Sequence, residues 1–82
     1  MKFKTGKYLR QRRLVLEISQ AEMARQLGVT SQFISRIEKG ISNPPSVYIK
    51  KIASILGIHI EEIVRMMVHD YEDHLKKQSK KG

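Results

Sequence analysis

Residues 19–40 read SQAEMARQLGVTSQFISRIEKG and contain the start signals of two consecutive helices. Ser19 is a preferred N-cap residue, and Glu22, three positions later, completes the pattern of a capping box. Thr30 is placed to cap a second helix in the same way, after Gly28 has ended the first. This stretch therefore predicts two short helices joined by a tight turn.

The rest of the chain carries helix signals as well. Gly40 and Gly57 each follow an apolar segment of helical periodicity, and Pro44-Pro45 separates two such segments. No stretch shows the alternation of a strand hairpin. The fold class is therefore all-α, with one domain over residues 1–75 and a basic tail, residues 76–82, that we expect to be disordered. The five expected helices cover residues 6–16, 20–27, 31–39, 46–56 and 60–75.

Composition limits the function classes. The chain has 82 residues, a net charge of +8 and no cysteine, which indicates one small domain without disulfides or thiolate metal sites. No apolar run approaches the roughly 20 residues that cross a bilayer, so we expect a cytoplasmic protein. Six cations and no acid occur up to Arg13, whereas residues 61–73 contain five acids. This separation of charge favours a molecule with one cationic face for a polyanion.

The helix expected over residues 31–39 has two distinct faces. Phe33, Ile34 and Ile37 cluster on one side of a helical wheel. The opposite side carries amide, hydroxyl and cationic groups, and no carboxylate: Ser31, Gln32, Ser35, Arg36 and Lys39. Such groups read base edges in the major groove of DNA. An ordinary solvated face is the alternative, but on a basic chain with a helix-turn-helix pattern we favour contact with double-stranded DNA.

Residues 8–64, which include NPPSVYIKKIASILGIHIEEI after the two capped helices, resemble the phage repressor/Cro-type helix-turn-helix family, the lambda repressor-like domains. The resemblance implies a five-helix domain whose recognition helix begins at Ser31 and enters the major groove.

The resemblance also assigns roles to single residues. It implies that base edges are contacted by Thr30, Ser31, Gln32 and Arg36, and the helical wheel adds Ser35 to these base-reading residues. It implies phosphate contacts by Gln20, which also braces the recognition helix, and by Lys39, Ser42 and Asn43. Arg13 and Glu38 match a structural pair between the first and third helices. From their charge we add Lys7 and Arg10 to the phosphate-binding residues.

Several positions depart from the family pattern. Arg12 stands where an aliphatic residue is usual, and Glu17 where glycine is frequent. His59 replaces the usual Ser or Thr cap of the last helix. The apolar residues Leu14, Leu16 and Phe33 either complete the small core, which we favour, or form an exposed patch for a partner.

The last helix continues beyond the minimal domain of the family. Its apolar residues follow helical spacing to Leu75. We expect four of them to contribute to a two-fold homodimer interface: Met67, Val68, Tyr71 and Leu75. An amphipathic membrane helix is the alternative, but the acids of its polar face argue against membrane binding. Those acids are Glu61, Glu62, Asp70, Glu72 and Asp73.

Enzymatic activity and metal binding find little support. His59, His69 and His74 have no metal-ligand spacing, and the glycines are too scattered for a phosphate loop. We expect no enzymatic activity, no metal, no cofactor and no small-molecule ligand.

These observations predict a homodimeric, sequence-specific regulator of transcription, most simply a repressor, that is cytoplasmic and associates with the nucleoid when bound to DNA. Two alternatives stay open. One is an antitoxin or controller-type regulator that also binds a protein partner, such as a toxin. The other is a helix-turn-helix adaptor that binds only proteins.

Overall fold

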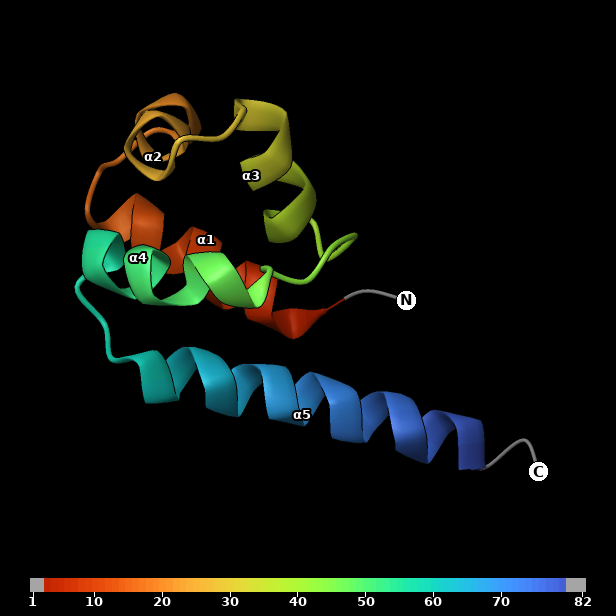
Figure 1. The fold of residues 1–82 in the computed structure, drawn as a ribbon. Helices are drawn as coiled ribbons and strands as arrows, with labels where there is room; N and C mark the ends of the chain where they lie inside the picture. The colour runs from red at the N-terminus through yellow and green to blue at the C-terminus, as the bar shows by residue number, and fades with distance from the viewer. Residues whose placement is uncertain (1–2, 80–82) are drawn as a thin grey trace.

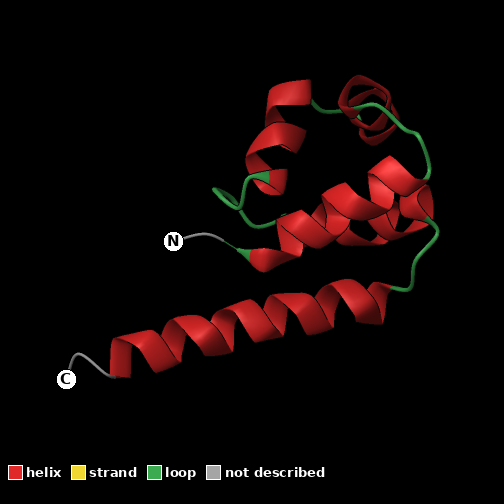
Figure 2. Cartoon of the chain, turned by 180° about the vertical axis from the view of Figure 1, so that it is seen from behind, coloured by secondary structure: helices red, strands yellow, loops and turns green. Residues whose placement is uncertain are grey.

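The computed structural model describes residues 3–79, which form five α-helices and no strand (Figures 1 and 2). Helices α2 and α3 lie at one end of the molecule in Figure 1, α1 and α4 form the middle, and α5 runs along the opposite side. No helix in this part of the chain is long and apolar enough to cross a membrane. The helices are α1 Lys4–Val15, α2 Gln20–Leu27, α3 Ser31–Glu38, α4 Ser46–Leu56 and α5 Ile60–Ser79.

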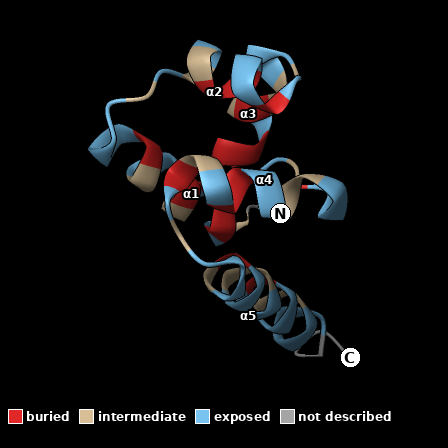
Figure 3. Ribbon diagram, turned by 60° about the vertical axis from the view of Figure 1, so that its left-hand side comes forward, coloured by how far each residue is buried: buried red, intermediate tan, exposed pale blue. Residues whose placement is uncertain are grey.

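One apolar core joins all five helices. Phe33 of α3 packs on this core and meets Tyr48 of α4 edge to face, with ring centroids 5.4 Å apart. Figure 3 shows buried residues in α1 and α3, whereas most of α5 is exposed or intermediate. The buried apolar residues are Leu9, Met23, Ala24, Leu27, Ile34, Ile37, Ile52, Ala53, Leu56 and Ile63.

The predicted caps define the helix-turn-helix. The Ser19 hydroxyl accepts a hydrogen bond from the Glu22 N–H at 3.0 Å, and the Thr30 hydroxyl accepts one from the Phe33 N–H at 3.1 Å. Gly28 ends α2 in the left-handed conformation, with φ 79°. The reciprocal half of the capping box is not formed, because the Glu22 carboxylate pairs with Arg25 instead.

Two helices are longer than the sequence predicts. Helix α1 begins at Lys4 rather than residue 6, because its first N–H groups are capped by the carboxylate of Asp70 from α5. Helix α5 ends at Ser79 rather than residue 75. In the structure the helix thus continues through residues 76–79 of the segment expected to be a disordered tail, and Lys76 and Lys77 lie at a helix end that favours cations. Residues 80–82 lie outside the described chain.

The end of α1 differs from the favoured prediction. Leu14 and Leu16 are 48% and 38% exposed, so they do not complete the core, although Phe33 does. Arg12, at a position where the family pattern has an aliphatic residue, has a structural role. Its Nε donates a hydrogen bond to the Leu56 carbonyl at 2.9 Å and so caps the C-terminal end of α4. Glu17 adopts a left-handed conformation, φ 57°, at the position where relatives often have glycine.

Candidate nucleic-acid interface

The outer face of α3 has the polar composition that the sequence predicts. Ser31, Gln32 and Arg36 are exposed, and Ser35 is partly exposed. Within residues 3–79, no hydrogen bond or ion pair engages the side chains of Gln32 or Arg36. These groups are therefore available to contact an external partner.

The one acid of α3 is turned away from this face. Glu38 is buried, and its carboxylate accepts hydrogen bonds from Arg13 Nε at 2.6 Å and from Arg13 Nη2 at 3.0 Å. Hydrogen bonding to Glu38 raises the pKa of Arg13, against the opposing effect of burial. The predicted Arg13–Glu38 pair is thus present, and it leaves the exposed face of α3 without negative charge.

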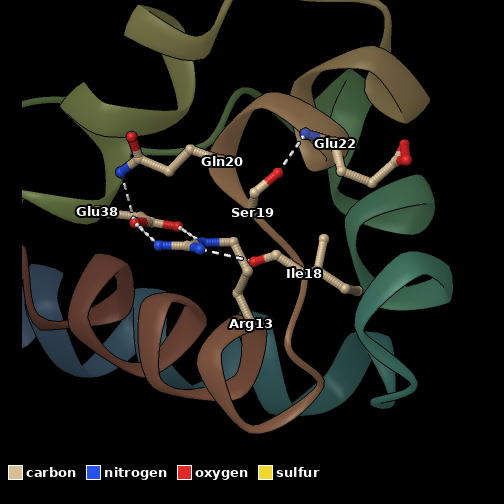
Figure 4. A network of polar contacts seen from close by, with 6 residues as sticks. All are labelled: Arg13, Ile18, Ser19, Gln20, Glu22 and Glu38. Atoms are coloured by element: carbon tan, nitrogen blue, oxygen red, sulfur yellow. Dashed lines mark hydrogen bonds and ion pairs between the residues drawn. The ribbon is translucent and has the colours of Figure 1, made fainter.

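Gln20 strengthens the same network. Its Nε2 donates to Glu38 Oε1 at 3.0 Å, so the first residue of α2 braces the last residue of α3 (Figure 4). Arg13 also donates through Nη1 to the Ile18 carbonyl at 2.7 Å, next to the Ser19 cap. Figure 4 shows this guanidinium between Glu38 and the chain that enters α2. The network fixes the angle between the two helices of the motif.

Three of the predicted phosphate-binding cations line one hollow. Lys7 and Arg10 come from α1, and Lys39 is the residue that ends α3. The hollow also includes Phe3, Lys4 and the paired Glu38. A cationic hollow beside the C-terminal end of α3 is suited to a phosphate group.

Other predicted contact residues lie in different surroundings. The Thr30 hydroxyl accepts a hydrogen bond as the cap of α3 and can still donate its proton outwards. Ser42 is partly buried, and its N–H donates to the Arg36 carbonyl at 3.3 Å. Asn43 lines two hollows together with Tyr71 of α5, so the structure does not group it with the cations beside α3.

A second surface is apolar and lies on α5. Val64, Val68, Tyr71 and Leu75 are exposed, with exposed fractions of 51% for Val68 and 62% for Tyr71. Met67, which the sequence also predicts at the dimer interface, is partly buried and packs against the core. We call these four exposed residues the α5 stripe.

Asp70 is the residue whose role the sequence pattern conceals. It was expected on the acidic polar face of the last helix, but it is only 2% exposed and binds the first turn of α1. Glu62 is likewise a partner of α1, through the hydroxyl of Tyr8. The sequence gives one signal of this contact between α1 and α5: acids are concentrated in residues 61–73, and bases in the residues up to Arg13. No group of three His, Cys, Asp or Glu residues within residues 3–79 is placed to hold a metal.

A capped helix pair, an acid-free face on its second helix and an adjoining cationic hollow define a DNA-binding helix-turn-helix domain. The model of a helix-turn-helix family matches residues 9–63, and the chain belongs to this family of Cro/CI-type proteins. The resemblance found in the sequence is thereby confirmed, and the protein is a DNA-binding transcriptional regulator.

Individual relatives agree with this class. An uncharacterized HTH-type transcriptional regulator of Methanothermobacter thermautotrophicus is 41% identical over 56 residues, which are 67% of this chain and 81% of the relative. The restriction-modification controller protein C.AhdI from Aeromonas hydrophila is 31% identical, with a TM-score of 0.68 over 74% of this chain and 88% of that one. The clp gene regulator ClgR from Corynebacterium glutamicum shares the fold at 19% identity, with a TM-score of 0.70 over 92% and 85%.

Proposed function

We propose that this regulator binds a two-fold symmetric DNA operator as a homodimer, with α3 of each subunit in the major groove. The observation that carries the proposal is the exposed, acid-free face of α3 beside the hollow lined by Lys7, Arg10 and Lys39. Neutralisation of phosphates by these cations supplies affinity for any sequence, whereas contacts to base edges supply the preference for one.

The side chains of α3 differ in what they can recognise. Arg36 is suited to the two acceptors of guanine, and Gln32 to the donor and acceptor of adenine. Ser31, Ser35 and Thr30 offer single hydroxyl contacts to base edges or to the flanking phosphates. Gln20 and Ser42 would add contacts to the DNA backbone from either side of α3. Bound over a promoter, such a dimer would exclude polymerase, so we expect repression.

The experiment compares Arg36→Ala with Lys39→Ala on a preferred site and on its single-base variants. Loss of a bidentate base contact should cost Arg36→Ala about 1–3 kcal/mol on the preferred site and remove discrimination at one position. Lys39→Ala should weaken binding to all variants equally. Equal losses on every sequence for Arg36→Ala would show that Arg36 contacts only phosphate, contrary to the proposal.

The α5 stripe supports the dimer. Its four residues are spaced by four, three and four positions, which is the a/d spacing of a coiled-coil seam. Beside the stripe, Ile49 and Met67 line an apolar hollow with Val64 and Val68. A second copy of α5 presents the same stripe, and an isologous contact of this kind generates the two-fold axis that a symmetric operator requires. An operator read in this way requires the two α3 helices to lie about 34 Å, roughly 10 base pairs, apart.

Sedimentation equilibrium tests the dimer with a matched pair of variants. Val68→Glu places a charge in the stripe and should give a monomer. Val47→Glu introduces the same charge at an exposed residue of α4 outside the stripe and should remain dimeric. A wild-type chain that is monomeric at tens of micromolar, both alone and on DNA, would contradict the proposed dimer.

A second candidate is a controller-type or antitoxin-like regulator that also binds a protein partner. The exposed run Leu14, Val15 and Leu16 at the end of α1 favours it, because it lies outside both surfaces described above. The similarity to a restriction-modification controller is compatible with either candidate. The test is the double variant Leu14→Ser/Leu16→Ser, measured for DNA affinity and for regulation in the native cell. Loss of regulation with unchanged DNA affinity would support this candidate, and unchanged regulation would count against it.

A further inference from the structure

The first turn of α1 is held by a carboxylate from the middle of α5. Asp70 Oδ1 accepts a hydrogen bond from the Lys4 N–H at 2.8 Å. Asp70 Oδ2 accepts one from the Thr5 N–H at 2.9 Å and one from the Thr5 hydroxyl at 2.6 Å. Phe3 stands at the N-cap position and provides no side-chain acceptor. Asp70, 65 residues along the chain from Thr5, therefore performs the capping that a local side chain usually performs.

The same turn of α1 packs directly on the end of α3. A Cβ atom added to Gly6 would lie 1.8 Å from the Ile37 carbonyl oxygen, so only glycine allows this approach. The Phe3 N–H donates to the Gly40 carbonyl at 3.1 Å, immediately after α3. The backbone of the first turn thus lies between Asp70 on one side and the C-terminal end of α3 on the other.

The position of this turn decides where the cations of α1 lie. Lys7 follows Gly6 in the chain, and Lys39 follows Glu38 at the end of α3. Both side chains line the hollow beside α3, together with Arg10. If the first turn moved away from Ile37, Lys7 and Lys39 would separate, and they would no longer face one phosphate.

We propose that Asp70 is a positioning residue for DNA binding: it holds the first turn of α1 against the end of α3 and so aligns Lys7 with Lys39. The inference rests on the proposed phosphate role of these lysines. It makes α5, which carries the stripe, also the helix that supports the phosphate-binding hollow. Asp70 itself is buried, so its role would be indirect, through the position of α1.

The test measures binding to a fluorescein-labelled mixed-sequence duplex between about 50 and 200 mM salt, where the slope against log salt reports the number of phosphates contacted. Asp70→Ala should bind several-fold more weakly, and its slope should fall in magnitude by about one. Glu72→Ala removes the same charge from an exposed position of α5 two residues later. This control should keep the wild-type slope.

A milder pair of variants covers the case in which Asp70→Ala does not fold. Thr5→Val removes only the hydroxyl that donates to Asp70, whereas Thr5→Ser keeps it. We expect Thr5→Val to show the reduced slope and Thr5→Ser to restore the wild-type value. A folded Asp70→Ala with the slope of Glu72→Ala would overturn the proposal, as would equal slopes for the two Thr5 variants.

Lys7→Ala distinguishes a failure of the proposed phosphate role of Lys7 from a failure of the positioning role of Asp70. A slope reduced by about one for Lys7→Ala and also for Asp70→Ala supports both the phosphate role and the positioning role. A reduced slope for Lys7→Ala alone overturns only the positioning role of Asp70. An unchanged slope for Lys7→Ala overturns the phosphate role and, with it, the inference about Asp70.

Discussion

Arg13 of α1 and Glu38 of α3 form a two-point ion pair, with Arg13 Nε 2.6 Å from Glu38 Oε2 and Nη2 3.0 Å from Oε1. Both side chains are buried, and Gln20 and the Ile18 carbonyl complete their hydrogen bonds. The pair joins α1, which carries the proposed phosphate-binding residues Lys7 and Arg10, to α3, which carries the proposed base-reading side chains. Part of the positive charge of the chain is therefore structural and not available to DNA.

Removal of one partner from this pair should be costly, because it leaves the other charge buried. We expect Glu38→Ala to lower the free energy of unfolding by about 3–5 kcal/mol. The double variant Arg13→Met/Glu38→Leu should recover much of that loss, since it buries no unpaired charge. Glu22→Ala, which breaks the exposed pair with Arg25, is the control and should cost less than about 1 kcal/mol. Urea unfolding measures all three, and a small loss for Glu38→Ala would contradict the structural role.

Glu17→Gly should stabilise the protein. Glu17 has φ 57°, where a residue with a side chain is strained by about 1–2 kcal/mol and glycine is not. The greater freedom of glycine in the unfolded chain offsets roughly 0.5–1 kcal/mol of that gain. Thermal unfolding should therefore show a net stabilisation of up to about 1.5 kcal/mol. Glu61→Gly, at an exposed position in the first turn of α5, is the control and should destabilise instead, because it removes an acid that favours this helix end and adds backbone freedom.

Tyr8 should make stability depend on alkaline pH. Its hydroxyl donates to Glu62, and this hydrogen bond together with burial raises the pKa of Tyr8 above 10.0. Because the pKa of Tyr8 is higher in the folded than in the unfolded chain, its hydroxyl stabilises the fold fully below pH 10.0. This contribution is lost as the pH rises through the pKa of Tyr8 in the folded protein. Tyr8→Phe should cost about 1 kcal/mol at neutral pH and little at strongly alkaline pH. A difference between the two proteins that stayed constant across pH would show that the hydrogen bond does not contribute.

The elements defined by local chemistry could be predicted from the sequence. Ser19 and Thr30 cap N–H groups three residues away, and Gly28 ends a helix by its own backbone conformation. The face of α3 follows from helical periodicity, because Ile34 and Ile37 are buried and thereby orient Gln32 and Arg36 outwards. These features depend on short-range contacts, which a single sequence displays.

The features that depended on distant contacts could not be predicted. Asp70 shares the spacing of the other acids of α5, and nothing local distinguishes an acid that will be buried against Thr5 from one that will be solvated. The start of α1 at Lys4 follows from the same contact. Leu14 and Leu16 are apolar like core residues, yet within residues 3–79 both remain exposed at the end of α1. The Arg13–Glu38 pair was foreseen only because the chain resembles a known family.

Selection of binding sites from a pool of random double-stranded DNA, with the purified full chain, tests the central claim most directly. We expect enrichment of an inverted repeat whose half-site centres lie roughly 10 base pairs apart. Repetition with Arg36→Ala should erase the preference at one position in each half-site, whereas Lys39→Ala should leave the motif unchanged. A pool without any enriched motif, or a motif that Arg36→Ala does not alter, would contradict the claim that α3 reads the operator.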